Sequence, residues 1–182
     1  ETDDVKYDNN KRRAQKYAIE EEKQLTFVKA RDKASAHTLR ERPEAGLHQE
    51  KKKWLTRHDR ECGDLYGMLP LVEGMPVMLT EHVDRNPEKN LLRGRIGYIQ
   101  SWELADSESS KDGGKKRVLD KLPKAVHVKF LVEEKGKLVE PKWKVGSLPH
   151  GVYPIVPQRA DWYLDKGRSH PNRVGPTHAR EH

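Results

Sequence analysis

The run Leu69–Trp102 constrains the fold of this 182-residue chain more than any other stretch. It holds two short apolar segments rich in residues that favour β-structure, Pro76–Thr80 and Ile96–Trp102. The polar loop His82–Asn90 lies between them, and a glycine turn beginning at Gly94 leads into the second segment. The order of strand, loop, turn and strand predicts a β-ribbon with a charged tip. If the chain has a nucleus for a core, we expect it here.

Composition limits the size of that core and suggests a partner. Charged residues make up 36% of the chain and hydrophobic residues 34%, so we expect one small core. The net charge of +7 favours acidic partners such as nucleic acid. The alternative is that this charge has no binding role, because 29 acidic residues interleave the basic ones and much of the charge is solvated surface.

A single cysteine, Cys62, excludes an internal disulfide and fits a reducing compartment. We therefore expect an intracellular protein, nuclear if the source is eukaryotic. No apolar run approaches the ~20 residues that a membrane-spanning helix requires, so we expect no membrane partner. We also expect a monomer. The first residue is Glu rather than Met, which suggests a fragment of a longer polypeptide.

Residues 1–64 are predicted to be helical and partly α/β. The periodicity of Val5–Glu22 predicts a helix with a narrow apolar stripe, and Leu25–Ala30 reads as a strand. Two short helices are plausible over Ser35–Arg42 and His48–Arg60. These elements need a partner sheet against which to bury their apolar residues.

Residues 65–164 are predicted to form a small β-barrel. Ala125–Val132 alternates apolar and polar residues and is the clearest strand in the chain, while Leu138–Val145 and Gly151–Val156 predict two more. With the ribbon, these make about five short strands separated by loops, and an SH3-like or OB-like barrel is the natural way to close them.

Two segments lack any hydrophobic period. Residues 103–121 contain the pair Gly113-Gly114 and predict a flexible loop, and residues 165–182 predict a disordered tail. The fold class is therefore predicted to be α+β: a small SH3-like or OB-like barrel preceded by a helical, partly α/β segment and followed by a tail.

Catalytic motifs are missing from this sequence. It contains no GxxxxGK(S/T) phosphate-binding loop and no GxSxG nucleophile elbow. The nine histidines are scattered and the one cysteine has no CxxC partner, so we expect no metal site. His58 stands beside Asp59, but neighbours on a helix point about 100° apart and do not face each other.

Basic and aromatic residues of the strands and of the ribbon point to contact with nucleic acid. Such residues combine phosphate contacts with base stacking in proteins that bind single strands. Trp102 and Trp143 could instead be core residues, and the arginines could protect a sheet edge from aggregation. The candidate binding residues are Arg85, Lys89, Arg93, Arg95, Trp102, His127, Lys129, Lys142 and Trp143.

The stretch 69–99 resembles a segment of the PIF-type superfamily-one DNA helicases. That segment runs L-x-x-G-x-P-V-M-L-x-x-N-x-D … G-L-x-N-G-x-x-G-x-V. Here His82 replaces an Asn, Asn90 the first Gly of the second half and Arg93 the Asn before Gly94, and Ile99 stands in place of the final Val. The matching residues are Leu71, Gly74, Pro76, Val77, Met78, Leu79, Asp84, Leu91, Gly94 and Gly97.

The helix at the start of the chain extends this resemblance. Val5–Ala18 is similar to the family helix that carries N-x-x-V-x-x-x-N-x-x-R, with Val5, Asn9 and Arg12 on the Val, the second Asn and the Arg. Thr2 stands where the first Asn would be. The later strands fit helicase-like versions carried by mobile elements.

The resemblance implies a middle slice of a helicase, made of part of the second RecA-like domain and its inserted SH3-like barrel. In the family this barrel helps to grip single-stranded DNA during translocation. The family's Walker motifs precede this region and its T-x-H-K-x-Q-G motif follows it, so neither is expected here. ATP and magnesium serve the intact family, and the slice alone is expected to bind no cofactor and to unwind nothing.

Two hypotheses follow. In the first, the chain is a helicase fragment that binds single-stranded DNA weakly and with strong salt dependence, and that pairs with the remainder of a motor. In the second, it is a non-catalytic small-barrel module for protein interaction or for structure, with an incidental basic surface. No constellation of residues supports an independent enzyme.

Overall fold

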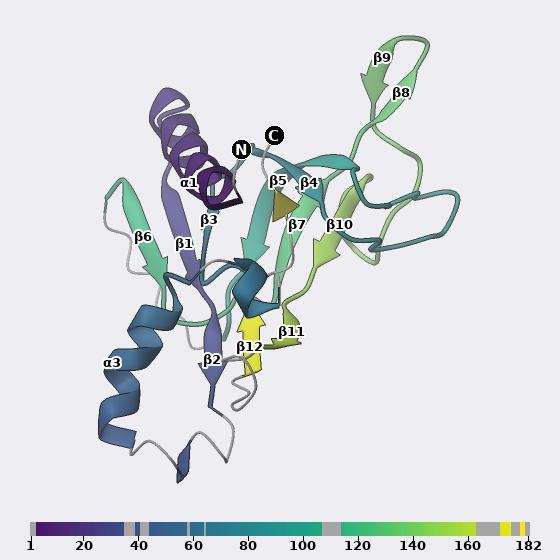
Figure 1. Ribbon diagram of the computed structural model, residues 1–182. Coiled ribbons are helices and arrows are strands. Elements are labelled where there is room, and N and C mark those ends of the chain that lie inside the picture. The colour runs from purple at the N-terminus through teal and green to yellow at the C-terminus, as the bar shows by residue number, and fades with distance from the viewer. Residues whose placement is uncertain are drawn as a thin grey trace.

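Figure 1 shows the computed structural model, which describes residues 3–34, 39–40, 44–57, 59–63, 65–106, 114–162, 172–175 and 179–180. The helices α1 (Asp3–Glu20) and α3 (Glu44–Trp54) and the 3-10 turn η1 (Asp59–Cys62) accompany several small β-sheets. The protein is therefore α+β, as predicted. None of its described helices is long and apolar enough to cross a membrane.

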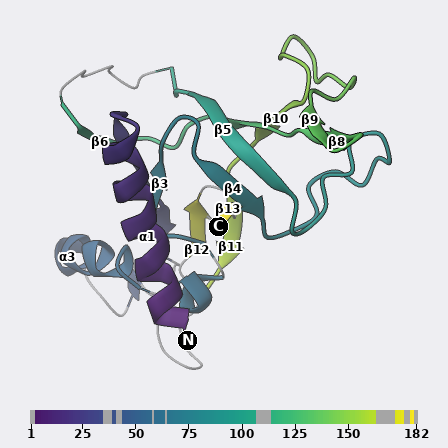
Figure 2. The same ribbon diagram turned by 90° about the horizontal axis from the view of Figure 1, so that it is seen from above.

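A three-stranded sheet lies under α1, as Figure 2 shows from above. Its central strand β1 pairs antiparallel with β3 and parallel with β6. Ala14 and Ala18 of α1 are buried in the same core as the strands, because the helix turns its narrow apolar stripe toward β1 and β3. The strands are β1 (Leu25–Lys29), β3 (Met68–Leu71) and β6 (Lys116–Leu119).

This sheet links the two halves of the predicted organisation. It takes β1 from residues 1–64 and takes β3 and β6 from residues 65–164. The expected helix Val5–Glu22 and strand Leu25–Ala30 are confirmed to within two residues at each end. The division into separate domains stays a prediction, although the shared sheet joins both segments.

A five-stranded sheet contains the predicted ribbon. Its order is β10-β7-β5-β4-β13, and every neighbouring pair is antiparallel. The strands β4 and β5 are the two arms of the ribbon, and β5 carries an irregularity between Ile99 and Ser101. The bounds are β4 (Pro76–Leu79), β5 (Ile96–Glu103), β7 (Ala125–Lys129), β10 (Val152–Ile155) and β13 (Ala179–Arg180).

One face of this sheet forms the core. Val126, Val128 and Phe130 are buried, while His127 and Lys129 between them are only partly covered. The alternation predicted for Ala125–Val132 is therefore confirmed over β7. The same hydrophobic cluster includes residues of α1 and β1, so one core serves both sheets.

A second, smaller core holds α3 against the chain. It contains Trp54 and Trp162, whose ring centroids lie 5.5 Å apart in an edge-to-face arrangement, together with Leu47 and the buried Cys62. Arg57 stands 5.5 Å from the centroid of the Trp162 ring.

A further sheet has the order β11-β12-β2, with the bounds β2 (Arg31–Lys33), β11 (Gln158–Asp161) and β12 (Asn172–Gly175).

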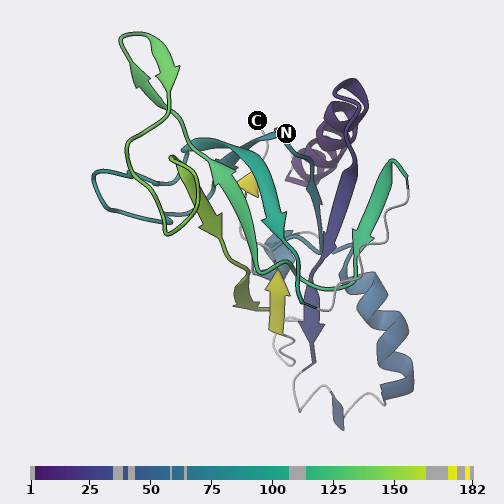
Figure 3. The same ribbon diagram turned by 180° about the vertical axis from the view of Figure 1, so that it is seen from behind.

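The hairpin of β8 (Val132–Glu134) and β9 (Lys137–Val139) stands away from the rest of the chain in Figures 1 and 3. Its turn is Lys135-Gly136, and both residues have positive φ, 51° and 75°. Consecutive positive φ values match the twist of a two-residue hairpin. The predicted strand Leu138–Val145 was wrong beyond Val139, because Pro141 has no N–H to donate to a ladder.

The structure corrects other expectations. Lys116–Leu119, inside the predicted flexible loop 103–121, is the strand β6, and its pairing with β1 supplies order that local composition does not reveal. The predicted disordered tail 165–182 contains β12 and β13, which pair with strands far away in sequence.

Only one of the two predicted short helices can be compared with the structure over most of its length. The helix predicted over His48–Arg60 begins earlier, at Glu44, and ends at Trp54. The helix predicted over Ser35–Arg42 falls mostly outside the described residues. Closure of the strands into a barrel stays a prediction.

Candidate nucleic-acid-binding surface

The register of β5 and β7 brings two predicted residues beside an exposed aromatic ring. Tyr98 lies opposite Lys129, and Ser101 lies opposite His127. Directly opposite residues of antiparallel strands point to the same face of a sheet. These four side chains therefore share one face, which is turned away from the core formed by their buried neighbours.

The strand β4 widens this face with apolar side chains. Its register places Pro76 opposite Tyr98 and Met78 opposite Ile96. Ile96 is 45% exposed and Tyr98 is 36% exposed, so both large side chains contribute apolar surface to this face. We call this surface the outer sheet face, and its residues are Pro76, Met78, Ile96, Tyr98, Ser101, His127 and Lys129.

The charges on the outer sheet face have partners of their own. The Lys129 ammonium donates a hydrogen bond to the Glu140 carboxylate. That hydrogen bond, and then the charge of Lys129, lower the pKa of Glu140. Ser101 Oγ and His127 Nδ1 lie 3.0 Å apart, and the tautomer of the imidazole decides which atom donates. The face is therefore mildly basic rather than strongly so.

Hydrogen bonds of the backbone and of two side chains order the ribbon loop between β4 and β5. Leu91 is fully buried and exchanges hydrogen bonds with Asp84, from Leu91 N to Asp84 O at 2.9 Å and from Asp84 N to Leu91 O at 3.2 Å. At the tip, Asp84 Oδ1 accepts from Asn86 N and Asn86 Oδ1 accepts from Glu88 N. Successive turns of this kind order a loop through its own side chains.

Lys89 is held inside this loop. Its Nζ lies 2.6 Å from Asp84 Oδ2, with both side chains largely covered, and 5.7 Å from the ring centroid of Tyr153 on β10. The hydrogen bond from Lys89 is the main reason that the pKa of Asp84 is lowered. The same hydrogen bond is the main reason that the pKa of Lys89 is raised. Lys89 thus ties the loop to β10, so its ammonium already has an anionic partner.

The loop arginines differ in exposure. The side chains of Arg85 and Arg93 are exposed, and the backbone N–H of Arg93 donates to His82 Nδ1 at 3.2 Å. Arg95 is half-buried, and its guanidinium donates to the carbonyl of Leu131 just beyond β7. Arg85 and Arg93 are therefore open to solvent on the loop, whereas Arg95 links the end of the loop to the segment that follows β7.

The two predicted tryptophans, Trp102 and Trp143, differ in how deeply they are buried. Trp143 is 8% exposed and belongs to the core, so its ring is not available to stack on a base. Trp102 is half-buried and packs against the same core. Lys142 is exposed beside Trp143, and its carbonyl oxygen lies 3.0 Å from His150 Nδ1.

Sequence reasoning missed Tyr98 and Ile96 as surface residues. The segment Ile96–Trp102 reads as an apolar strand, and its inward position next to Tyr98 is a glycine. A Cβ on Gly97 would lie 2.6 Å from Val128 Cγ1, so the core needs a glycine at that position. Period-two alternation through Gly97 and Ile99 would have turned Ile96 and Tyr98 outward. That alternation was the available signal.

The described residues contain no group of three or more His, Cys, Asp or Glu side chains placed to hold a metal ion.

No protein-family model matches this sequence, and a search of curated proteins returns no relative. Among solved structures, the crystal structure of Pif1 helicase from Candida albicans is similar over 92% of this chain, at 15% sequence identity and with a TM-score of 0.48. The chain spans 31% of the length of that helicase chain.

Proposed function

We propose that this chain is a segment of a PIF-type helicase that binds single-stranded DNA through the outer sheet face and the exposed arginines of the ribbon loop. The five-stranded sheet is, in this proposal, part of an SH3-like barrel. The sequence resemblance over 69–99 supports the family, and the chemistry of the outer sheet face supports the ligand. ATP and magnesium would be bound by other parts of the motor.

The observation that carries the proposal is the exposed ring of Tyr98 next to a cation. Tyr98 lies opposite Lys129 and beside the exposed Ile96. Base stacking on an exposed aromatic ring is tolerant of sequence, because every base has a π-face. Single strands expose their bases and duplexes do not, so such a surface favours single-stranded DNA over a duplex.

The loop would add phosphate contacts. Arg85 and Arg93 are exposed on a loop that is braced by the Asp84–Lys89 pair and by the buried Leu91. A braced loop holds its arginines without a large entropic cost on binding. We therefore assign stacking to Tyr98 and charge neutralisation to Arg85 and Arg93, with Lys129 shared between Glu140 and the ligand.

Fluorescence anisotropy with a labelled oligothymidylate tests this proposal. We expect saturable binding at low salt that weakens steeply between about 50 and 200 mM salt, because phosphate contacts release counterions. The double variant Arg85→Glu, Arg93→Glu should lose most of this binding. The double variant Lys52→Glu, Lys53→Glu makes the same charge change on exposed residues of α3 and is the matched control. An oligonucleotide that does not bind at low salt would refute the proposal.

A protein-interaction module is the second candidate, and the ion pairs favour it. Lys89 pairs with Asp84 and Lys129 pairs with Glu140, so two of the predicted binding cations are already neutralised. The remaining outer sheet face is apolar enough to receive a peptide. Under this alternative, oligothymidylate does not bind, and capture of a protein partner survives Arg85→Glu, Arg93→Glu but is lost with Ile96→Asp.

A further inference from the structure

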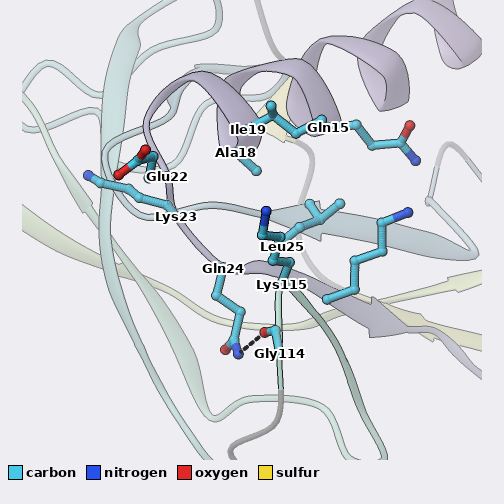
Figure 4. A pocket seen from close by; sticks show the side chains of 10 residues that line it. Gln15, Ala18, Ile19, Glu22, Lys23, Gln24, Leu25, Gly114 and Lys115 are labelled. Atoms are coloured by element: carbon cyan, nitrogen blue, oxygen red, sulfur yellow. Dashed lines mark hydrogen bonds between the residues drawn. The ribbon is translucent and has the colours of Figure 1, made fainter.

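A trough runs beside α1, on the sheet that does not carry the outer sheet face. Figure 4 shows it between the last turns of the helix and the starts of β1 and β6. Its volume is ≈ 950 Å³, within the size range of small-molecule and side-chain binding pockets. Ala18 and Leu25, both buried, supply apolar surface, and Ile19 lies on the helix side.

The trough exists because α1 covers only part of its sheet. The helix packs on β1 and β3, and Lys11 stands 6.0 Å from the ring centroid of Phe27, which marks the covered face. Phe27 lies opposite Val118, and Leu25 lies opposite Lys116, so β6 presents Val118 and Lys116 on that same face. Among the described residues, α1 packs on β1 and β3, and the Lys116 and Val118 side chains of β6 remain exposed.

Apolar side chains are left in solvent on both sides of this gap. Ile19 is 75% exposed on α1, and Val118 is 43% exposed on β6. An apolar sheet face in a folded protein is normally buried against another packed layer of secondary structure. A helix lying next to α1, at the usual 8–10 Å between axes, is the element that would cover a strand in this position.

The rim of the trough is basic. Lys115, just before β6, and Lys116, its first residue, are exposed, and the Lys23 side chain donates to the neutral carbonyl oxygen of Glu73. Glu22 is the one acidic residue among the described residues that line the trough. A ligand that buries an apolar stripe here therefore gains from carboxylates on its flanks.

We propose that this trough docks an amphipathic α-helix of a partner protein. The apolar stripe of that helix would lie on Ala18, Ile19 and Leu25 of the trough and on the neighbouring Val118 of β6, with its acidic residues against Lys115 and Lys116. The inference is independent of DNA binding, since none of these residues belongs to the outer sheet face or to the ribbon loop. The trough has no aromatic lining among its described residues, so it offers no stacking platform for bases.

A fluorescent probe at the rim tests the proposal. Ile19→Cys receives an environment-sensitive fluorophore, and the native Cys62 is fully buried and thus slow to react. The probe molecule is a synthetic helical peptide with leucines at i, i+3, i+4 and i+7 flanked by glutamates. We expect a saturable blue shift of the fluorophore on titration, because the leucines would remove it from water.

Variants and control peptides separate the two contributions. Val118→Asp should abolish the blue shift, and Lys115→Glu or Lys116→Glu should each weaken binding roughly two- to fivefold, as expected for exposed ion pairs. A peptide with lysines in place of the glutamates should bind more weakly than the acidic one. A fluorophore on Leu138→Cys, at an exposed residue of β9, should not respond to either peptide.

Four results would overturn the proposal. The first is no blue shift at Ile19, and the second is equal binding of the lysine peptide. The third is a fluorophore already shielded in the free chain, because the chain itself would then cover the trough. The fourth is a blue shift produced by raising the concentration of the labelled chain alone, which would identify a second copy as the occupant.

Discussion

Tyr98 on β5 lies directly opposite Lys129 on β7, on the face of the five-stranded sheet that is turned away from the core. The pair places an exposed aromatic ring beside a cation, while Ile99 and Val128, one position along each strand, are buried. One strand pair thus contributes to the core on one side and to the exposed outer sheet face on the other.

The first prediction concerns Tyr98. Replacing it with alanine removes an exposed ring, so stability should change little, while affinity for oligothymidylate should fall by about 1–3 kcal/mol if one base stacks on this ring. Anisotropy titration measures the loss. Leu138→Ala removes an exposed apolar side chain from β9, outside the proposed binding surface, and should leave affinity unchanged. Equal losses in both variants would argue against a specific role for Tyr98.

The second prediction concerns the loop arginines. Arg85→Ala and Arg93→Ala should each reduce the slope of log affinity against log salt by about 0.7, because each removes one phosphate contact to a single strand. The measurement is a set of titrations at four or more salt concentrations. Lys52→Ala on α3 is the control for the loss of one exposed charge. An unchanged slope in either arginine variant would remove that residue from the interface.

The third prediction concerns acid. The pKa of Asp84 is lowered from its ordinary value of 3.8, chiefly by the hydrogen bond from Lys89. A lowered pKa in the folded chain means that Asp84 stabilises the loop above pH 3.8 and loses this contribution as the pH falls through the folded-state pKa. The amide signals of Val83 and Leu91, whose hydrogen bonds close the loop, should therefore shift in that acid window.

Asp84→Asn should remove that acid transition, because the amide side chain does not titrate. The variant can still accept the hydrogen bond from Asn86 N, so the local turn should persist. Glu88→Gln, in the same loop and exposed, is the control and should keep the transition. A transition that persists in Asp84→Asn would assign it to another group.

The fourth prediction concerns Gly97. Alanine is normally better than glycine in a strand by roughly 0.5–1 kcal/mol. Here the new Cβ would lie 2.6 Å from Val128 and 2.8 Å from the ring of Phe130. Overpacking of this kind costs typically 1–3 kcal/mol, so Gly97→Ala should lower the free energy of unfolding. Urea denaturation measures it, and a variant more stable than wild type would show that the core has room.

Local patterns predicted the ribbon and much of the core. The alternation of Val126, Val128 and Phe130 set the face of β7, and the turn at Gly94 was expected because the two apolar segments flank a polar loop. The same patterns did not separate Trp102 from Trp143. Both are tryptophans near charged residues, and only the packing of the chain decides that Trp143 lies in the core.

Partners distant in sequence account for what was missed. Lys116–Leu119 becomes a strand because β1 pairs with it, and Asn172–Gly175 becomes one because β11 and β2 do. The role of Lys89 depends on Asp84 and on Tyr153 from β10, which is more than sixty residues away. Composition near Lys89 indicates a charge on a loop, but it does not indicate that the charge is paired.

Amide chemical shifts during titration with oligothymidylate test the central claim most directly. At low salt we predict that the largest shifts fall on Tyr98, Ser101, His127 and Lys129 and on the loop around Arg85 and Arg93, while α1 and β6 do not respond. Shifts confined to α1 and β6, or no shifts at any concentration, would contradict the assignment of this surface to single-stranded DNA.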